Sequence, residues 1–452
     1  MRTFTTYLFI LLLFIPITSL GQTHTWTGNG GDTNWFNSSN WDVNSVPDTS
    51  SDVLIPAGFT VDITTSPALV DQITIESQAI IEVNNSIEIT TGINILKDAL
   101  FQFNLGSLSG NAIITNQGTF EITGVPNKLI SQLTINNENL LLINESGNIN
   151  LRNNMIINNA ESALILVDGA GGAFSSNETG ATLNNFGTLR RMDIGQFGVF
   201  YLLLTVNNYG VIKVEKSQNI LILTSQNSLN NFETGILTGE GSFDITSPFT
   251  NNGRIIPDGD QGTELGFINT FNLSPQSIIE LDIYGNELEE YDSIFVIDNP
   301  FIEGAIEVTL HYEAAINDEF TIITSTQGIS GCDLPPSIFT VYQGVQYEFE
   351  VNCTFDEVIL KVVDKILNVE EFDRMNLSAL PNPNYGTFEI QFGSQVSEIK
   401  LTITNVLGQT LSTHTVQNTD SHQLTIDGAA GIYFITAKTA GGKIETFKVI
   451  KK

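Results

Sequence analysis

Asparagine doublets close the segments LTINN (residues 133–137), MIINN (155–159), ATLNN (181–185), LTVNN (204–208), SLNN (228–231) and PFTNN (248–252). From the first asparagine of one doublet to the first of the next, the steps are 22, 26, 23, 23 and 21 residues. A repeat with a period in the twenties is typical of a solenoid, in which each repeat forms one coil. We therefore expect a parallel β-helix with one doublet in each coil.

The doublets are expected to lie at the corners of the coils. Asparagine tolerates a left-handed backbone better than most residues do. Gly187, Gly210 and Gly253, which stand next to doublets, are expected to supply positive φ angles. Stacked asparagine amides can also donate hydrogen bonds from one coil to the next. The doublets thus predict both the turn of each coil and a link between coils.

Short strands precede and separate the doublets. Residues 60–63 (TVDI), 72–76 (QITIE) and 86–89 (SIEI) place apolar side chains at every second position, which is the period of a β-strand. Polar turns rich in Asn, Gly and Ser separate such segments. The fold class that we predict is all-β, with a parallel β-helix over residues 59–271, β-rich caps at both of its ends and a small C-terminal domain.

Charge is distributed unevenly along the 452-residue chain, whose formal net charge is −32. Residues 22–375 hold 45 acidic and 11 basic residues, whereas residues 376–452 hold 5 acidic and 6 basic residues. This asymmetry marks residues 376–452 as a separate unit. We expect no nucleic-acid partner for so acidic a body, because binding to phosphates needs clustered Lys and Arg.

The first 21 residues have the composition of a signal peptide. Arg2 supplies a positive charge, residues 7–17 form a short apolar core, and residues 19–21 (SLG) form a small-x-small cleavage site. The apolar core is too short to span a bilayer comfortably, and no later segment reaches eighteen apolar residues. We expect an exported mature chain that begins at Gln22 and has no transmembrane segment.

Residues 22–58 contain all three tryptophans of the chain. The first coil of a solenoid exposes an apolar stacking face and needs an atypical cap, which bulky aromatic side chains can provide. The alternative is a sugar platform on which Trp35 and Trp41 stack and Asp42 binds hydroxyls. The segment resembles the leader at the start of bacterial surface β-helix proteins, and this resemblance favours the cap.

Residues 272–364 break the period with longer strands, such as IIELDI (278–283) and AIEVTL (305–310). The order of these strands resembles the closing module of passenger domains in autotransporter-like β-helix proteins. The resemblance implies a β-rich module that caps the C-terminal end of the β-helix.

Cys332 and Cys353 are the only cysteines. In an exported chain, two cysteines 21 residues apart are expected to form one disulfide, which would pin the C-terminal cap. A metal pair or a redox thiol is the alternative, but the CxxC spacing and an adjacent histidine are absent.

The tail, residues 376–452, follows a short charged linker at 365–375. Its short strands recur about every ten residues, and we expect seven of them in a small Ig-like β-sandwich. Its turn and strand motifs are PNP (381–383), VLG (406–408), GIYF (431–434) and KVIKK (448–452). These motifs resemble the C-terminal sorting domain of the type IX secretion system of Bacteroidetes, and the resemblance covers all of the tail.

The resemblance implies a route and a set of sorting residues. The signal peptide would take the chain into the periplasm, and the outer-membrane type IX machinery would then read the tail. In this family the tail is usually removed, and the product is secreted or linked to surface lipopolysaccharide on the outer cell surface. The sorting motif would comprise Pro381, Asn382, Pro383, Gly386, Gly408, Gly431, Tyr433, Lys448 and Lys451.

Catalytic motifs are not evident in the sequence. Of the four histidines, only His311 lies in the body away from its ends, and we interpret it as an alternating strand residue. The single basic pair on the repeats, Arg190 and Arg191, is interpreted as exposed strand charge, although β-helix lyases do pair a basic residue with calcium ligands. The sequence therefore predicts no catalytic residues and favours a protein that is not an enzyme.

One turn has the composition of a cation site. Asp258, Asp260 and Glu264 stand close together in a glycine-rich segment, and carboxylate oxygens are ligands that Ca²⁺ prefers. The full twelve-residue calcium-loop pattern is absent, so a solvated turn is the alternative. Calcium is the one cofactor that the sequence suggests.

Export signals and repeats together predict a secreted or cell-surface β-helix protein with an adhesive or structural role. The alternative is a β-helix protein that binds or degrades polysaccharide. Beyond the secretion machinery, the expected partners are surface lipopolysaccharide or extracellular glycans.

Overall fold

The computed structural model describes residues 22–144, 147–169, 172–176, 180–192, 198–215, 219–223, 228–246, 248–259, 261–367, 377–439 and 444–452. The chain divides into two compact units, residues 1–366 and residues 367–452, which we call the body and the tail. The predicted signal peptide and most of the predicted linker lie outside the described residues.

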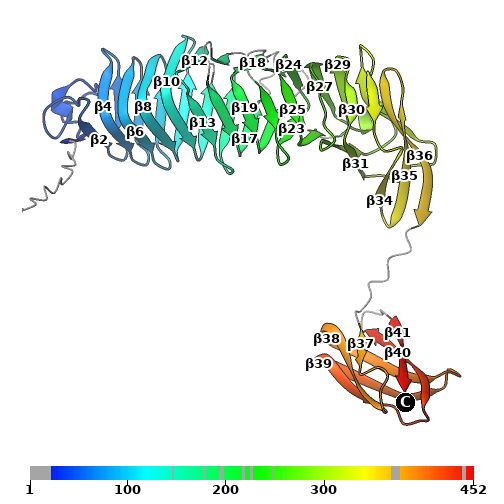
Figure 1. The fold of residues 1–452 in the computed structure, drawn as a ribbon. Helices are drawn as coiled ribbons and strands as arrows, with labels where there is room; N and C mark the ends of the chain where they lie inside the picture. The colour runs from blue at the N-terminus through cyan, green and yellow to red at the C-terminus, as the bar shows by residue number, and fades with distance from the viewer. Residues whose placement is uncertain are drawn as a thin grey trace, which may run out of the picture. The chain divides into compact units, whose positions relative to one another are not determined.

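The body is a stack of coils joined by parallel strand pairing (Figure 1). One sheet contributes a single strand to each coil: β3 (Thr60–Ile63), β5 (Ile80–Val83), β7 (Leu100–Phe103), β9 (Thr119–Thr123), β11 (Leu140–Asn144), β14 (Leu164–Asp168), β17 (Thr188–Arg191), β20 (Val211–Val214), β23 (Ile236–Gly239), β26 (Arg254–Pro257), β28 (Ile278–Ile283) and β31 (Ala305–Leu310). The predicted parallel β-helix is confirmed.

The other sheet is bent, so that it supplies two faces of each coil. Early coils run through the bend as one long strand: β4 (Ala68–Ile75), β6 (Ile87–Ile95), β8 (Gly106–Asn116) and β10 (Lys128–Asn137). Later coils divide at the bend: β12 (Asn148–Arg152) and β13 (Ile156–Asn159), β15 (Ala173–Ser175) and β16 (Thr182–Asn185), β18 (Gly198–Leu203) and β19 (Thr205–Asn208), β21 (Asn219–Leu223) and β22 (Leu229–Asn231), β24 (Ser242–Ile245) and β25 (Phe249–Asn251). Strand β10 pairs with both β12 and β13, which shows how one strand becomes two.

Alternate side chains along these strands fill the interior of the coils. Strands β3, β5 and β7 all repeat the order half-buried, buried, half-buried, buried. Inward residues are Ile, Val, Leu and Phe, and equivalent rings meet between coils, as Phe101 and Phe120 do edge-on with centroids 5.2 Å apart. Burying one such side chain stabilises the fold by about 1.5–3 kcal/mol, so a coil acquires its stability by covering its neighbour.

The N-terminal segment covers the first coil. Strand β1 (Gln22–Thr25) pairs in parallel with β2 (Ser51–Ile55), and the segment between them includes a 3₁₀ turn, η1 (Ser38–Asn40). Trp26, Trp35 and Trp41 are at most 2% exposed, and the rings of the first two meet Trp41 edge-on at 5.0 and 4.9 Å. Backbone hydrogen bonds also tie this segment to Asp62 in the first coil.

The second asparagine of the first five doublets, together with the first asparagine of the sixth, points into the coil and forms a buried ladder. Each amide donates to the side-chain oxygen of the equivalent asparagine in the next coil toward the C-terminus, at 2.6–2.8 Å. The members of this inner ladder are Asn116, Asn137, Asn159, Asn185, Asn208, Asn231 and Asn251, all at most 1% exposed. The ladder begins one coil before the first doublet, and Asn251 ends it by donating to Ser277 Oγ at 3.2 Å.

The first asparagine of each of the first five doublets forms a second ladder on the outer surface. Here each amide donates toward the N-terminus, at 2.9 Å, so this outer ladder runs opposite to the inner one. Its members are Asn136, Asn158, Asn184, Asn207 and Asn230. The expected links between coils are confirmed.

Two expectations about the doublets are wrong. None of the doublet asparagines, all of which lie among the described residues, has a positive φ, because they end extended strands and do not form the turn. Gly187, Gly210 and Gly253 do not have positive φ either. A Cβ on any of them would lie 2.1–2.2 Å from a carbonyl oxygen of the preceding coil, so the close approach of coils is what requires glycine there.

The stack continues beyond the boundary predicted at residue 271. Strand β28 pairs in parallel with β26 and β31, and β27 (Glu264–Asn269) pairs with β29 (Ser293–Ile297), which pairs with β32 (Glu319–Ser325). Strand β30 (Phe301–Glu303) also pairs in parallel with β33 (Gly331–Asp333), and the 3₁₀ turn η2 (Leu288–Glu290) lies between β28 and β29. Longer strands hid the period in the sequence, but their inward positions still match the coils before them.

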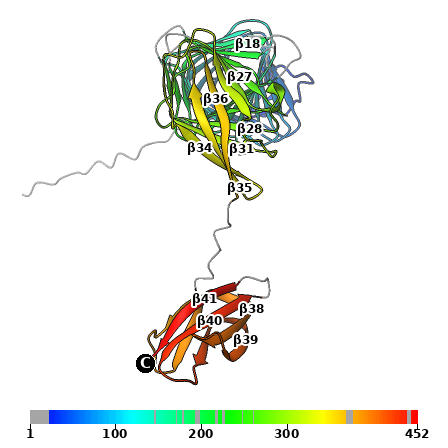
Figure 2. The same cartoon turned by 90° about the vertical axis from the view of Figure 1, so that its right-hand side faces the viewer.

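Antiparallel strands close the C-terminal end of the body. Strands β34 (Ser337–Tyr342) and β35 (Val345–Cys353) form a hairpin, and β36 (Glu357–Leu367) runs antiparallel to β32. Figure 2 looks onto this end of the stack, where β34, β35 and β36 lie in front of the coils. The disulfide between Cys332 and Cys353 is confirmed, and it joins β33 to the end of β35.

The tail is an antiparallel β-unit with its own core. Its strands are β37 (Ser378–Leu380), β38 (Thr387–Asn405), β39 (Thr410–Thr425), β40 (Gly431–Thr439) and β41 (Ile444–Lys451). The expectation of seven short strands is wrong, because β38 passes through a register shift between Gln391 and Val396 without ending. Buried Phe388, Ile390 and Leu401 are among the core residues that it contributes.

The inner ladder makes a prediction about stability. Asn185→Ala removes the acceptor for Asn159 and both donors of its own amide, which reach Asn208 and the Val211 carbonyl. Because the polar groups that lose their hydrogen-bond partners are buried, we expect a loss of about 3 kcal/mol in the free energy of unfolding. Guanidinium denaturation followed by circular dichroism measures it. Asn184→Ala, in the half-exposed outer ladder, is the matched control and should cost below about 1 kcal/mol; equal losses would contradict the role of burial.

Candidate functional site

Some of the sorting residues predicted in the tail, Asn382 and Lys448 among them, meet where the PNP turn contacts the last strand. Asn382 Oδ1 accepts a hydrogen bond from the Ile450 amide at 2.8 Å, and its side-chain amide donates to the Lys448 carbonyl at 2.9 Å. Asn384 is fully buried and pairs through its backbone with Ile450 and Lys452. The PNP turn at the start of the tail is therefore tied to the last strand, 66 to 68 residues further along the chain.

Other residues of the motif stabilise the same unit. Lys451 Nζ donates to the Ile426 carbonyl at 2.8 Å and packs near Gly386, whose φ is +109°. Tyr433 donates its hydroxyl to the Ala429 carbonyl at 2.6 Å. Gly408 turns the chain between β38 and β39 with a φ of +77°. The motif residues thus form turns of the tail and hydrogen bonds that join its first turn to its last strand.

Exposed apolar side chains surround this framework. Tyr385, directly after the PNP turn, is 85% exposed, and Leu407 in the turn before β39 is 79% exposed.

Residues 378–452 match the family described as the secretion system C-terminal sorting domain. The tail is a type IX sorting domain. This sorting domain marks proteins that the type IX system exports to the cell surface or the extracellular space, and the chain is such an exported protein. The secretion machinery is therefore a partner of the sorting domain.

The body gives less information by comparison. Residues 25–124 match a family described as a domain of unknown function, DUF8693, which spans the tryptophan segment and the first coils. No curated protein matches the chain. Among the described residues, no helix has the length and apolar character needed to cross a membrane.

The tryptophans suggested as a sugar platform are placed inside the body. Trp35 is 0% and Trp41 is 1% exposed, so neither ring has a free face on which a sugar could stack. Trp41 also donates its indole N–H to the Trp35 carbonyl at 2.8 Å. Asp42 accepts a hydrogen bond from the Thr25 amide at 2.9 Å. This geometry favours the cap interpretation over the platform.

The residues suggested for calcium are only partly described. Asp258 forms an ion pair with Lys213 at 2.6 Å, Glu264 is exposed at the start of β27, and Asp260 lies outside the described residues. Across the described ranges, no group of three His, Cys, Asp or Glu side chains is arranged to hold a metal ion. The calcium site stays a prediction.

Ion pairs link successive coils on the outer face of the single-strand sheet. Arg190 pairs with Glu215, and Arg254 pairs with both Glu280 and Glu307. The interpretation of Arg191 as exposed charge is wrong: it points inward, is 1% exposed, and donates to the Val167 carbonyl at 3.4 Å. Burial lowers the pKa of its guanidinium.

The one body histidine away from the N-terminal cap lies at the C-terminal end of this face. His311 Nε2 lies 2.8 Å from Asp282 Oδ1, and its ring stacks on Tyr284 with centroids 4.2 Å apart. A histidine bonded to a carboxylate is a group that can carry protons. His311 and Asp282 thus form a histidine–carboxylate pair on the outer surface, with side chains 38% and 41% exposed.

Asp292 is a buried carboxylate that the sequence gave no reason to single out. It is 3% exposed and accepts hydrogen bonds from the amides of Thr263 and Asp282, each at 2.9 Å. Burial raises its pKa to about 6, although the two amide donors act in the opposite direction. Its contacts join β28 to the turn before β27, so its role is to hold the coils together at this point.

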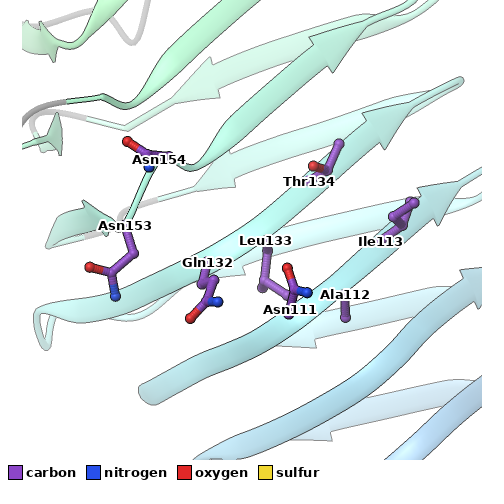
Figure 3. A pocket seen from close by; sticks show the side chains of 8 residues that line it. All are labelled: Asn111, Ala112, Ile113, Gln132, Leu133, Thr134, Asn153 and Asn154. Carbon is purple, nitrogen blue, oxygen red and sulfur yellow. The ribbon is translucent and has the colours of Figure 1, made fainter.

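A shallow groove of about 680 Å³ lies where the bent sheet turns its corner (Figure 3). Its lining is rich in amides: Asn111, Gln132, Asn153 and Asn154, with Ala112, Ile113, Leu133 and Thr134 beside them. Gln132, Asn153 and Asn154 have φ of +57° to +60°, so the left-handed asparagines expected at the doublets are found here. The doublet at 153–154, which lies out of step with the others, was the available signal in the sequence.

The raised pKa of Asp292 predicts a pH dependence. The native carboxyl keeps its proton up to about pH 6, whereas in the unfolded chain it loses the proton near pH 3.8. Stability therefore falls as the pH rises from about 4 to about 6, by up to about 3 kcal/mol, and is then constant. The measurement is the free energy of unfolding of the native chain minus that of Asp292→Asn, which has no titrating group there. A difference that rises or stays flat over this range would contradict the assignment.

The sorting domain predicts the fate of a truncated chain. Deletion of residues 376–452 should abolish export, since the secretion machinery then has no tail to read. Asn382→Ala, which unties the PNP turn from β41, should reduce export by a smaller factor. Cell fractionation with immunoblotting measures both, against the full-length chain in the same cells. Undiminished export of the deletion variant would refute this role.

Proposed function

We propose that the exported body acts outside the cell as a stiff, non-catalytic β-helix with an adhesive or structural role. The observation that carries this proposal is the pair of opposed asparagine ladders. The inner amides from Asn137 to Asn231 are buried and bonded to the coils on both sides, so bending the stack would break hydrogen bonds that water cannot replace. A rigid body of this kind suits a protein that bears load or presents surface.

The charges on the outer face support the same conclusion. Lys213 with Asp258, and Arg254 with Glu280 and Glu307, form ion pairs between coils. These pairs connect coils that are one or two steps apart, so they stabilise the stack in the same direction as the ladders. The remaining excess of acidic residues keeps the body soluble and repels other acidic polymers.

Polysaccharide binding is the second candidate, and the amide groove favours it. Asn and Gln side chains both donate and accept hydrogen bonds, as sugar hydroxyls do. The groove also presents Ile113, which is 51% exposed and offers an apolar surface to a sugar ring. If the bound chain were also cleaved, His311 with Asp282 would be the pair to test for proton transfer.

A two-part assay tests these roles. The exported protein is applied to a glycan array and is separately incubated with polysaccharides while reducing ends are measured. We expect no release of reducing ends, because the proposed role is not catalytic. Release that is lost in His311→Ala would contradict the proposal and support an enzyme. Array binding that is lost in Gln132→Ala but kept in Gln102→Ala, which lies on β7 outside the groove, would support the polysaccharide-binding candidate.

A further inference from the structure

Aromatic rings stack on the outside of three successive coils. Phe186 and Tyr209 lie with ring centroids 4.8 Å apart and 7° between their planes, and Tyr209 and Phe232 lie 4.3 Å apart with 2° between planes. Each follows an inner-ladder asparagine, and each backbone amide donates to the asparagine carbonyl of the preceding coil. The three rings therefore occupy one equivalent position, which we call the post-doublet position.

The same position is defined in the neighbouring coils. Toward the C-terminus it is filled by Asn252, whose amide bonds the Asn231 carbonyl. Toward the N-terminus it is filled by Ala160 and then by Glu138, whose amides bond the carbonyls of equivalent asparagines. The aromatic stack thus ends at Phe186, because the next position carries only a methyl group.

Phe186 consequently has one ring face without an aromatic neighbour. Its side chain is 48% exposed, whereas Tyr209, between two rings, is half-buried. Coils are about 4.8 Å apart, so the space over Ala160 extends roughly 9–10 Å from the Phe186 coil to the Glu138 coil. A ring that continued the stack by one coil would therefore lie above Ala160, at the contact distance of ~3.5–4.0 Å from the Phe186 ring.

We propose that this space binds one ring of a neutral saccharide, which stacks on Phe186 above Ala160. A pyranose has an apolar C–H face that can lie on the phenyl ring, and hydroxyls at its rim. Glu138, two coils before Phe186, is exposed and accepts a hydrogen bond from the Gln117 side-chain amide at 2.9 Å. Its carboxylate and that amide could form hydrogen bonds with the sugar hydroxyls.

Charge selects a neutral sugar over an acidic one. Glu138 and Glu161 flank the space and are exposed, and residues 22–375 hold 45 acidic against 11 basic residues. A uronic acid or sulfated sugar would meet repulsion from these carboxylates. A purely apolar occupant would instead remove Glu138 from water without replacing its hydrogen bonds.

This site names the class of ligand for the adhesive role proposed above, and the inference rests on that role. It is distinct from the amide groove, because the groove residues Asn153 and Asn154 precede strand β13, whereas Ala160 follows the end of that strand.

Titration calorimetry on the full-length chain tests the proposal with cellohexaose, mannohexaose and galactohexaose as neutral probes and trigalacturonate as the acidic probe. We expect at least one neutral probe to bind in the millimolar range or tighter, and trigalacturonate to bind at least tenfold more weakly. Phe186→Ala should weaken binding at least tenfold by removing the stacking surface. Ala160→Phe should abolish it, because the new ring fills the space and extends the stack.

Phe232→Ala is the matched control, since it removes a ring at the end already covered by Asn252 and should change affinity by less than twofold. Thermal melting checks that each variant folds. If Ala160→Phe fails to fold, the affinity of Phe186→Ala decides the outcome. Unchanged affinity in Phe186→Ala or Ala160→Phe overturns the site, as does a preference for trigalacturonate or absence of binding to all neutral probes. Binding that persists in both variants shows that the sugar binds at another site. The reducing-end assay described above tests the non-catalytic role separately, so the two proposals can fail independently.

Discussion

The hydrogen bond between asparagine side chains of successive coils is the interaction on which the body depends. A buried amide has two donors and an acceptor oxygen, and leaving any of them unpaired in the interior is costly. Asn185 satisfies all of them with the coils on either side, through Asn159, Asn208 and the Val211 carbonyl. The side-chain oxygens of Asn137 to Asn251 are bonded by the amide of the preceding coil, so each coil of the ladder requires its neighbour and these coils form a cooperative unit.

That dependence explains how the body must end. At the C-terminal side the inner ladder passes to Ser277, whose hydroxyl accepts from Asn251 and donates to the Asn251 carbonyl at 2.8 Å. At the N-terminal side the apolar interior is covered by three tryptophans. At the C-terminal end, antiparallel strands and the disulfide cover the last coil, which could otherwise pair with a further parallel strand.

Export and stacking place different demands on the two units of the chain. The sorting domain holds its two ends together through Asn382 and leaves Tyr385 and Leu407 in solvent, as suits a module that is read by other proteins. The body uses its polar residues between coils and keeps a few apolar ones outside. Phe186 is notable among these because the ring stack that it ends is set by the spacing of the coils.

The sequence by itself determined the solenoid, the ladders, the disulfide and the sorting tail. Each of these depends on a local pattern: a repeat in the twenties, alternation of apolar residues, two cysteines in an exported chain, and the PNP, VLG and KVIKK motifs. The parallel pairing and the bond between Cys332 and Cys353 agree with those patterns.

Only the tertiary structure decided which side of each strand faces inward and what lies across the gap between coils. One asparagine of a doublet is buried and the other is not, because successive residues of a strand point to opposite faces. Gly210 is required by a carbonyl oxygen one coil away, and Arg191 and Asp292 are buried by contacts made far along the chain. The open face of Phe186 likewise depends on Ala160, 26 residues earlier, which stacking alone brings beside it.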